Sequence, residues 1–302
     1  MRRVGVMVGT VLLAVITGTP SAVRAGAQTF NTALPVGEGN FVLREQLFYR
    51  RAGDDPTAAD RDTEAWGSVS ILGYGVTSDL TLFGALPIAV KSLEATTPSG
   101  ARVARDTRGI GDARLFARYT VFQDDAPGRT FRIAPFAGVE LPTGRDDDRD
   151  RLGRLPRPLQ LGSGSWDGFG GVVATWQTLA YEIDVQAAYQ VNTEANGFEF
   201  GDVARLDGSL QYRLWPRQLG PGVPGFLYGT LGANLVYRQE NEVAGASDPD
   251  SGGTQVFLAP GLQYVTKRWV LEGALELPVA QDLNAYGLED EVIARVGIRV
   301  NF

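Results

Sequence analysis

The sequence contains neither cysteine nor histidine among its 302 residues. Without cysteine, the chain can form no disulfide framework and no thiolate metal site. Without histidine, it lacks the commonest general base and the commonest metal ligand, which excludes Ser-His-Asp catalysis and histidine-based metal centres. We therefore expect no enzyme activity and no cofactor, since only a site made of carboxylates alone stays possible.

Long hydrophobic runs are also missing. Beyond residue 27, no stretch stays apolar over the roughly 18 residues that a membrane-spanning helix needs. Yet 44% of the residues are hydrophobic and 21% are charged, which is too apolar for a disordered chain. An exported protein of this composition is either soluble outside the cytoplasm or spans a membrane as a β-barrel.

The first 27 residues predict a cleaved secretory signal peptide. Two arginines follow the first methionine, residues 4–18 are apolar, and residues 25–27 form a small-x-small cleavage site. We expect residues 28–39 to form a short periplasmic segment. Cleavage removes three arginines and no acid, which takes the formal charge from −7 to −10. Nucleic acid is therefore not an expected partner.

About twelve segments alternate apolar and polar residues, the period-two pattern of a β-strand. In one of them, Ile183 and Val185 share a face, while Glu182 and Asp184 share the opposite face. The segments are 40–50, 65–75, 80–90, 111–122, 130–141, 165–176, 179–192, 202–215, 225–238, 253–266, 268–280 and 292–302.

The connections between these segments alternate in length. The short or medium ones are 76–79, 123–129, 177–178, 216–224 and 267–268. The longer ones are 51–64, 91–110, 142–164, 193–201 and 239–252, and a sixth connection, 281–290, is of middling length. This pattern is typical of outer-membrane barrels, which have tight periplasmic turns and longer outer loops. We therefore predict an all-β fold, a transmembrane antiparallel up-and-down β-barrel of about 12 strands over residues 40–302. A soluble secreted sandwich is the alternative.

Aromatic residues recur at the strand ends beside the short turns, and by parity all of them face outward. Amphipathic rings favour the interface between bilayer and water. We therefore predict a membrane-interface belt, and we expect the chain to end on phenylalanine because the final strand closes the barrel there. The belt residues are Tyr119, Trp176, Tyr181, Tyr212, Tyr264, Trp269 and Phe302.

Four ordered motifs resemble a known family. They are GYGVTSDLTLFGALP (73–87), GIGDARLFARY (109–119), ELPTGR (140–145) and GSGSWDGFGG (162–171). Together with the last strand they are similar to the outer-membrane barrels of the phenol-degradation MetA-pathway family. The resemblance implies a Gram-negative outer-membrane barrel linked to uptake of aromatic or other hydrophobic compounds. It supplies no catalytic residues, and the terminal Phe302 resembles the signal read by the barrel-assembly machinery.

The polar faces of the strands carry charges of both signs in balance. We predict that these side chains face the lumen and are candidates for binding a solute, while balanced charge also favours ion pairs that would close the lumen. The candidates are Arg114, Arg118, Arg132, Glu140, Asp184, Arg205, Asp207, Arg213, Glu272, Glu276, Arg295 and Arg299, with Asp112 and Glu182 beside them.

Two functional hypotheses follow for a barrel of this kind. The favoured one is passive uptake of small molecules, plausibly aromatic or hydrophobic ones. The alternative is a structural or adhesion barrel with a closed lumen and working surface loops. Both imply contact with outer-membrane lipid and lipopolysaccharide. Residues 146–150 offer a weak cation site in Asp146, Asp147, Asp148 and Asp150, against which stands a solvated charged loop.

Overall fold

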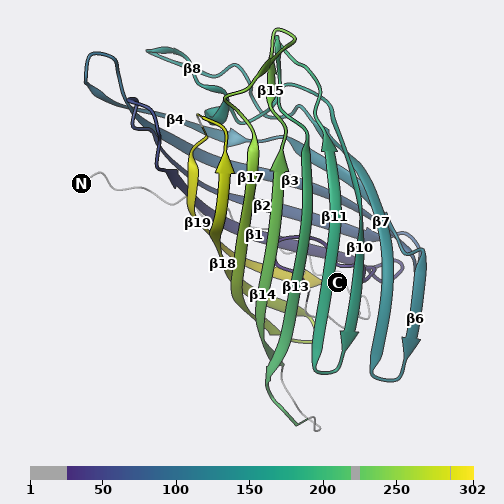
Figure 1. Cartoon of the computed structure of the whole chain (residues 1–302). Coiled ribbons are helices and arrows are strands. Elements are labelled where there is room, and N and C mark those ends of the chain that lie inside the picture. The colour runs from purple at the N-terminus through teal and green to yellow at the C-terminus, as the bar shows by residue number, and fades with distance from the viewer. Residues whose placement is uncertain (1–25, 219–224, 286) are drawn as a thin grey trace.

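The computed structural model describes residues 26–218, 225–285 and 287–302, whose long strands form one antiparallel sheet that closes on itself (Figure 1). Within those residues the closed sheet is a barrel of 12 strands, as the alternation predicted. Pairing of the first strand with the last closes it. The long strands are β1 (Phe41–Gly53), β2 (Asp62–Gly75), β3 (Leu80–Thr96), β5 (Ala113–Tyr119), β7 (Arg129–Leu141), β10 (Asp167–Thr178), β11 (Tyr181–Val191), β13 (Val203–Trp215), β14 (Phe226–Arg238), β17 (Gly253–Val265), β18 (Trp269–Leu283) and β19 (Glu289–Asn301).

One position in the barrel is built from three consecutive pieces of chain. The first two, β4 (Arg102–Ile110) and β5, both pair with β3, while β5 and β6 (Phe122–Ala126) both pair with β7. The breaks between the pieces fall at residues 111–112 and 120–121. The broken strand is therefore a single wall element that changes its partners along its length.

Side chains are distributed inside out compared with a water-soluble protein. Leu47 and Leu206 on the outer face are 58% and 53% exposed, whereas Asp184 and Gln211 on the inner face are at most 1% exposed. Such an apolar outer surface is stable only against lipid, because water would be ordered around every strand. The twelve long strands each pair on both sides, whereas β4 pairs only with β3 and β6 only with β7.

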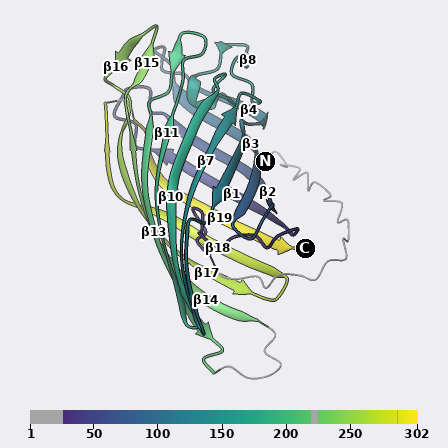
Figure 2. The same cartoon turned by 90° about the vertical axis from the view of Figure 1, so that its right-hand side faces the viewer.

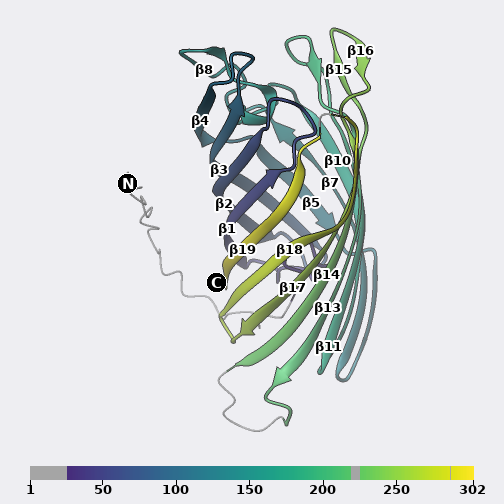
Figure 3. The same cartoon turned by 60° about the vertical axis from the view of Figure 1, so that its left-hand side comes forward.

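The two ends of the barrel differ, as Figures 2 and 3 show. Tight turns gather at one end, which we call the short-turn end, and extended loops gather at the long-loop end. No helix in the described ranges is long and apolar enough to cross a membrane. The long loops carry β8 (Arg149–Asp150), β9 (Gly153–Arg154), η1 (Arg157–Leu159), β12 (Phe198–Glu199), β15 (Asn241–Val243) and β16 (Ala246–Asp248).

The predicted loops at the long-loop end were too long, because the strands extend into them. The expected loop 91–110 contains the end of β3 and all of β4, and β1, β2, β18 and β19 also run further than expected. In β4 an inward-facing Arg105 bonds an outer loop, and an outward-facing Arg108 is exposed. Both faces of such a strand lie in a polar environment, so its residues show no apolar alternation.

Candidate functional site: the lumen and the segment inside it

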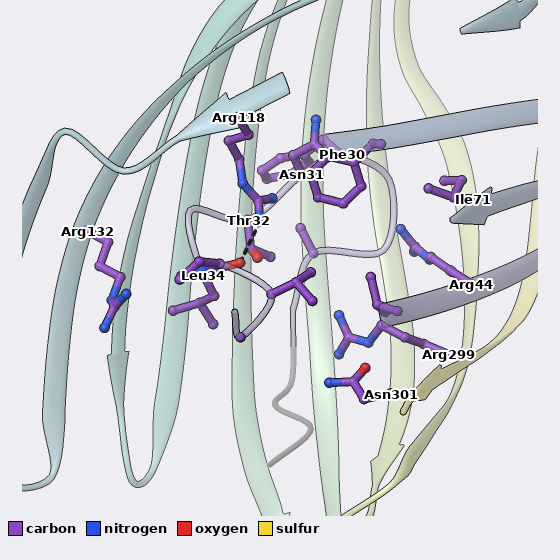
Figure 4. A pocket seen from close by; sticks show the side chains of 16 residues that line it. Phe30, Asn31, Thr32, Leu34, Arg44, Ile71, Arg118, Arg132, Arg299 and Asn301 are labelled. Carbon is purple, nitrogen blue, oxygen red and sulfur yellow. Dashed lines mark hydrogen bonds between the residues drawn. The ribbon is translucent and has the colours of Figure 1, made fainter. Parts of the chain in front are cut away.

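The N-terminal segment, residues 26–40, enters the barrel and crosses its lumen (Figure 4). The Gln28 amide donates hydrogen bonds to Thr230 Oγ1 on β14 (3.2 Å) and to the Leu262 carbonyl on β17 (3.1 Å). The Val36 N–H donates to Thr81 Oγ1 on β3 (3.2 Å). In the ring of strands β3 and β14 are six positions apart, so the segment joins opposite walls.

This placement differs from the expectation that residues 28–39 lie on the periplasmic side. The main chain of the segment needs hydrogen-bond partners, and the polar lumen supplies them. The Ala33 N–H donates to Thr175 Oγ1 (2.8 Å), and the Asn31 N–H donates to Gln186 Oε1 (3.4 Å). Thr29 also bonds the Asn234 side chain (3.1 Å). Residues 1–25 of the predicted signal peptide lie outside the described residues.

Gly75 lets the end of this segment pack directly against the wall. The Gly39 N–H donates to the Gly75 carbonyl (2.8 Å), and the Gly75 N–H donates to the Asn40 carbonyl (3.0 Å). A Cβ atom at Gly75 would lie only 2.2 Å from the Gly37 carbonyl oxygen. Any other residue at this position would therefore push the segment away from β2.

One side of the lumen is lined with carboxylates and amides, which we call the carboxylate–amide wall. Its members are Asp184, Gln186, Asp207, Gln211, Gln263, Glu272 and Glu276 on β11, β13, β17 and β18. The Gln211 amide donates to Asp184 (3.2 Å), and the Gln263 amide donates to Glu272 (3.1 Å). These amides give the buried carboxylates the partners that they would otherwise lose on leaving water.

Ion pairs join several of the predicted lumen charges. Arg114 pairs with Glu140, Arg205 with Asp207 (3.0 Å), and Arg295 with Glu276. Two further candidates pair with residues that the sequence analysis did not single out: Glu272 with Arg44 (2.6 Å) and Arg132 with Asp125 (2.9 Å). The balanced charges thus compensate one another, and their part in binding a solute stays a prediction.

The other candidate charges have different surroundings. Arg118 donates to the Leu34 carbonyl of the segment (2.6 Å) and lies over the Phe83 ring, 4.9 Å from its centroid. Arg213 lies over the Phe226 ring at 5.8 Å. The remaining three are Arg299, which lines a cavity with Asn301; Glu182, which bonds Gln177; and Asp112, which accepts from the Gly144 and Ser163 N–H groups of the 142–166 loop.

A cluster of phenylalanines faces the carboxylate–amide wall from β3, β5, β7 and β10. This phenylalanine cluster consists of Phe83, Phe116, Phe136 and Phe169. Phe83 and Phe116 stack with centroids 4.7 Å apart, and Phe116 lies 5.9 Å from Phe169. Ala33 of the segment packs in the same buried group as Phe136. Strand parity could have revealed these inward rings only where a charged neighbour fixes which face of the strand points inward.

Two cavities open at the ends of the lumen. The first, of about 310 Å³, lies at the short-turn end and is lined by the segment itself together with Arg44, Arg118, Arg132 and Arg299. The second, of about 370 Å³, lies at the long-loop end among Arg50, Lys91 and the outer loops. The segment residues 27–37 line only the first, so the segment stands on the short-turn side of the lumen.

The predicted belt aromatics lie at the short-turn end, and their role at a membrane interface stays a prediction. Tyr119, Trp176, Tyr212 and Trp269 are 38–54% exposed. Trp176 contacts Tyr181, Trp269 contacts Tyr264, and Phe302 stacks on Phe41 where β19 closes on β1.

A second group of exposed aromatics, which the predicted belt did not include, lies nearer the long-loop end. Trp66 contacts Tyr49 on the neighbouring strand, and Tyr189 and Tyr237 are also exposed. Trp66 and Tyr74 are eight residues apart on β2, or about 26 Å along a strand. With a strand tilt of about 35–45°, that separation spans about 18–21 Å along the membrane normal, within an apolar band of about 25 Å.

The acidic run of the outer loop is engaged with arginines. Asp146 faces Arg154 (3.5 Å) and Arg157 (3.6 Å), Asp148 faces Arg145 (3.2 Å), and Asp150 faces Arg105 (2.8 Å). Asp147 has no ion pair among the described residues. Within the described ranges no three acidic residues are grouped so that they could hold a metal ion. The arrangement favours a charged loop tied to β4 over a cation site.

The fold and the lined lumen define a membrane β-barrel whose interior is occupied by its own N-terminal segment. The sequence profile of one family matches residues 57–277, and the chain belongs to this family, described as "Putative MetA-pathway of phenol degradation". A comparison with curated proteins gives no match.

Solved structures are similar in fold. An outer membrane channel from Pseudomonas putida F1 has 14% sequence identity and a TM-score of 0.66, with 92% of this chain and 100% of that chain covered. The β domain of the Bordetella autotransporter BrkA has 12% identity and a TM-score of 0.46, covering 88% and 100%. The NanC porin has 13% identity and a TM-score of 0.46, covering 85% and 98%.

Proposed function

We propose that this protein is an outer-membrane channel for passive transport of small molecules. The observation that carries this proposal is a cavity at each end of the lumen, with the N-terminal segment crossing the lumen on the short-turn side. Hydrogen bonds from both walls hold the segment, including those that its carbonyls accept from Arg44 and Arg118, and each contributes about 0.5–1.5 kcal/mol, or about 1.5–3 kcal/mol where the donor is charged. Widening the path therefore requires the exchange of several of these bonds for others.

Aromatic or hydrophobic solutes are the cargo that the lumen suits best. The phenylalanine cluster offers stacked and edge-on ring faces, and the family description refers to phenol degradation. Charged groups at both cavities would act as selectivity elements for solutes that carry charge. Uptake of phenol by proteoliposomes, compared with uptake of a sugar of similar size, tests this preference.

The location and assembly of the protein form part of the same proposal. An exported barrel with an apolar outer face belongs in the outer membrane of a Gram-negative bacterium, with lipid and lipopolysaccharide around it. The short-turn end then faces the periplasm. The terminal β19 with Phe302 is the segment that the assembly machinery would read, and replacing Phe302 with Ser is expected to lower the amount of folded barrel in membranes.

The decisive experiment is single-channel recording of the refolded mature protein in a planar bilayer, beside a variant that lacks residues 28–36. We expect stable current steps from the full chain and steps at least severalfold larger from the variant, because the variant loses the only segment that crosses the lumen within the described residues. Heat-modifiable migration on gels serves as the folding control for both proteins.

A structural barrel with a closed lumen is the second candidate function. The ion pairs and amides that fill the carboxylate–amide wall favour it, because paired groups of this kind hold a lumen shut. Silence from both folded proteins in the bilayer would remove the channel and leave this candidate.

A further inference from the structure

The cavity at the short-turn end is lined by both cationic and apolar side chains. Arg44, Arg118, Arg132 and Arg299 line it, and no aspartate or glutamate is among its described lining residues. The apolar part of the lining includes Phe30, Leu34 and Ile71 (Figure 4). At about 310 Å³ its volume reaches the lower end of the ~300–1,000 Å³ range of small-molecule sites.

The carboxylates that compensate these arginines lie outside the cavity. Glu272 accepts from Arg44, and Asp125 accepts from Arg132, on sides that do not line the cavity. Arg118 makes no ion pair within the described residues; it donates to the Leu34 carbonyl and lies over the Phe83 ring. The cavity therefore presents guanidinium groups to a ligand without presenting an opposing negative charge.

We propose that this cavity binds a small organic anion with an aromatic body, such as an aromatic carboxylate. A planar guanidinium matches a carboxylate with two parallel hydrogen bonds. Phe30 and Ile71 line the same cavity, where they can pack on the aromatic part of the same ligand. This inference rests on the proposed transport function, since it names the class of solute that the short-turn end of the channel would hold.

The segment makes the site dependent on its own position. Phe30, Asn31, Thr32 and Leu34 line the cavity from the segment, so a bound anion would contact both the segment and the barrel wall. A ligand that competes with the Leu34 carbonyl for Arg118 would remove one of the bonds that hold the segment in place. Binding and opening of the channel would then be coupled.

Titration calorimetry on the folded full-length mature barrel in detergent tests the site, with benzoate, benzyl alcohol and inorganic phosphate as probes. We expect saturable benzoate binding at least about tenfold tighter than benzyl alcohol binding, because only benzoate carries the charge. Phosphate should bind more weakly than benzoate, because it makes no contact with the apolar side chains of the lining. Equal binding of benzoate and benzyl alcohol, or tighter binding of phosphate, would overturn the proposal.

Three variants locate the site. Arg118→Gln should weaken benzoate about tenfold and leave benzyl alcohol nearly unchanged. Because Arg118 also holds the segment, Arg132→Gln is the second variant, with an expected loss of about threefold or more. Arg129→Gln is the control, since Arg129 lies at the same end, pairs with Asp124, and does not line this cavity.

The binding measurement does not require the barrel to conduct, so it tests the anion site separately from transport. Wild-type affinity for benzoate in both Arg118→Gln and Arg132→Gln would place the anion elsewhere and overturn the site. Saturable binding by a barrel that passes no current would refute the proposed transport while leaving the anion site intact. Current without benzoate binding would refute the anion site and leave the proposed transport intact.

Discussion

The two walls of the lumen solve the same packing problem with different chemistry. The phenylalanine cluster fills its side with ring contacts, whereas the carboxylate–amide wall fills its side with hydrogen-bonded polar groups. The N-terminal segment meets both: Ala33 packs beside Phe136, and its N–H donates to Thr175. The contrast shows that the wall built of rings needs no hydrogen-bond partners, whereas the buried carboxylates of the polar wall depend on amide and hydroxyl donors beside them.

The largest expected effect comes from opening the aromatic wall. Phe136→Ala removes a ring that is 7% exposed and should lower the free energy of unfolding by about 3–5 kcal/mol, because a cavity remains. Urea unfolding in lipid vesicles measures the loss. Phe122→Ala is the matched control, since Phe122 is 48% exposed on the outer face. If Phe136→Ala lowers the free energy of unfolding no more than Phe122→Ala does, burial of the ring in the cluster adds nothing to the barrel's stability.

A smaller effect is expected where the polar wall holds the segment. Thr175→Val leaves the Ala33 N–H and one Asp184 oxygen without their hydroxyl partner, at a cost of about 1–3 kcal/mol. The same unfolding assay applies. Thr175→Ser keeps the hydroxyl and should retain most of the stability. A valine variant as stable as the wild type would show that the segment does not depend on this bond.

The ion pair between Arg114 and Glu140 tests whether lumen charges act on passing ions. If the lumen conducts, Arg114→Gln should shift the channel toward cations and Glu140→Gln should shift it toward anions, each by about twofold in permeability ratio. Reversal potentials in a salt gradient give these ratios. Shifts of the same sign in the two variants would indicate rearrangement of the wall rather than loss of one charge.

The smallest effect concerns a carboxylate outside the lumen, in the loop between β1 and β2. Hydrogen bonds from Arg61, with further ones from Thr57, hold the pKa of Asp55 well below its ordinary value of 3.8. A lowered pKa means that the stabilisation is complete above pH 4 and is lost as the pH falls through the folded pKa.

Pepsin digestion measures that pH dependence in the loop 54–61. We expect the wild-type loop to resist cleavage at pH 4 and to become sensitive only at the lowest pH at which pepsin acts. Asp55→Asn should be sensitive at both pH values, with Asp54→Asn as the control because Asp54 is exposed. Identical digestion of wild type and Asp55→Asn at pH 4 would contradict this account.

Most of the barrel could be predicted because each strand carries its own signal. The alternation in residues 181–191 and the short turn before them are local features, and the structure has β11 over the same residues. The twofold repeat fails where both faces of a strand meet a polar environment, as in β4 with Arg105 and Arg108. It also fails to separate inward rings such as Phe83 from outward ones, unless the charged neighbours fix the parity.

The occupied lumen could not be predicted, since it depends on pairs far apart in the chain. Gln28 and Leu262 are 234 residues apart, and Ala33 and Thr175 are 142 apart. Nothing in residues 28–39 alone distinguishes a segment outside the barrel from one inside it. The available signal was the repeated glutamines at inward positions, such as Gln186 and Gln263, whose amides can hydrogen-bond the main chain of a segment inside the lumen.

The sequence by itself determined that this chain forms a closed β-barrel without histidine or cysteine chemistry, because alternation, loop lengths and composition are local properties of the chain. Only the tertiary structure decided which charges pair, where the four arginines converge, and that the N-terminal segment enters the lumen. Closing the sheet into a ring brings opposite strands such as β3 and β14 to the two ends of one short segment. No periodic pattern along a single strand contains that distance.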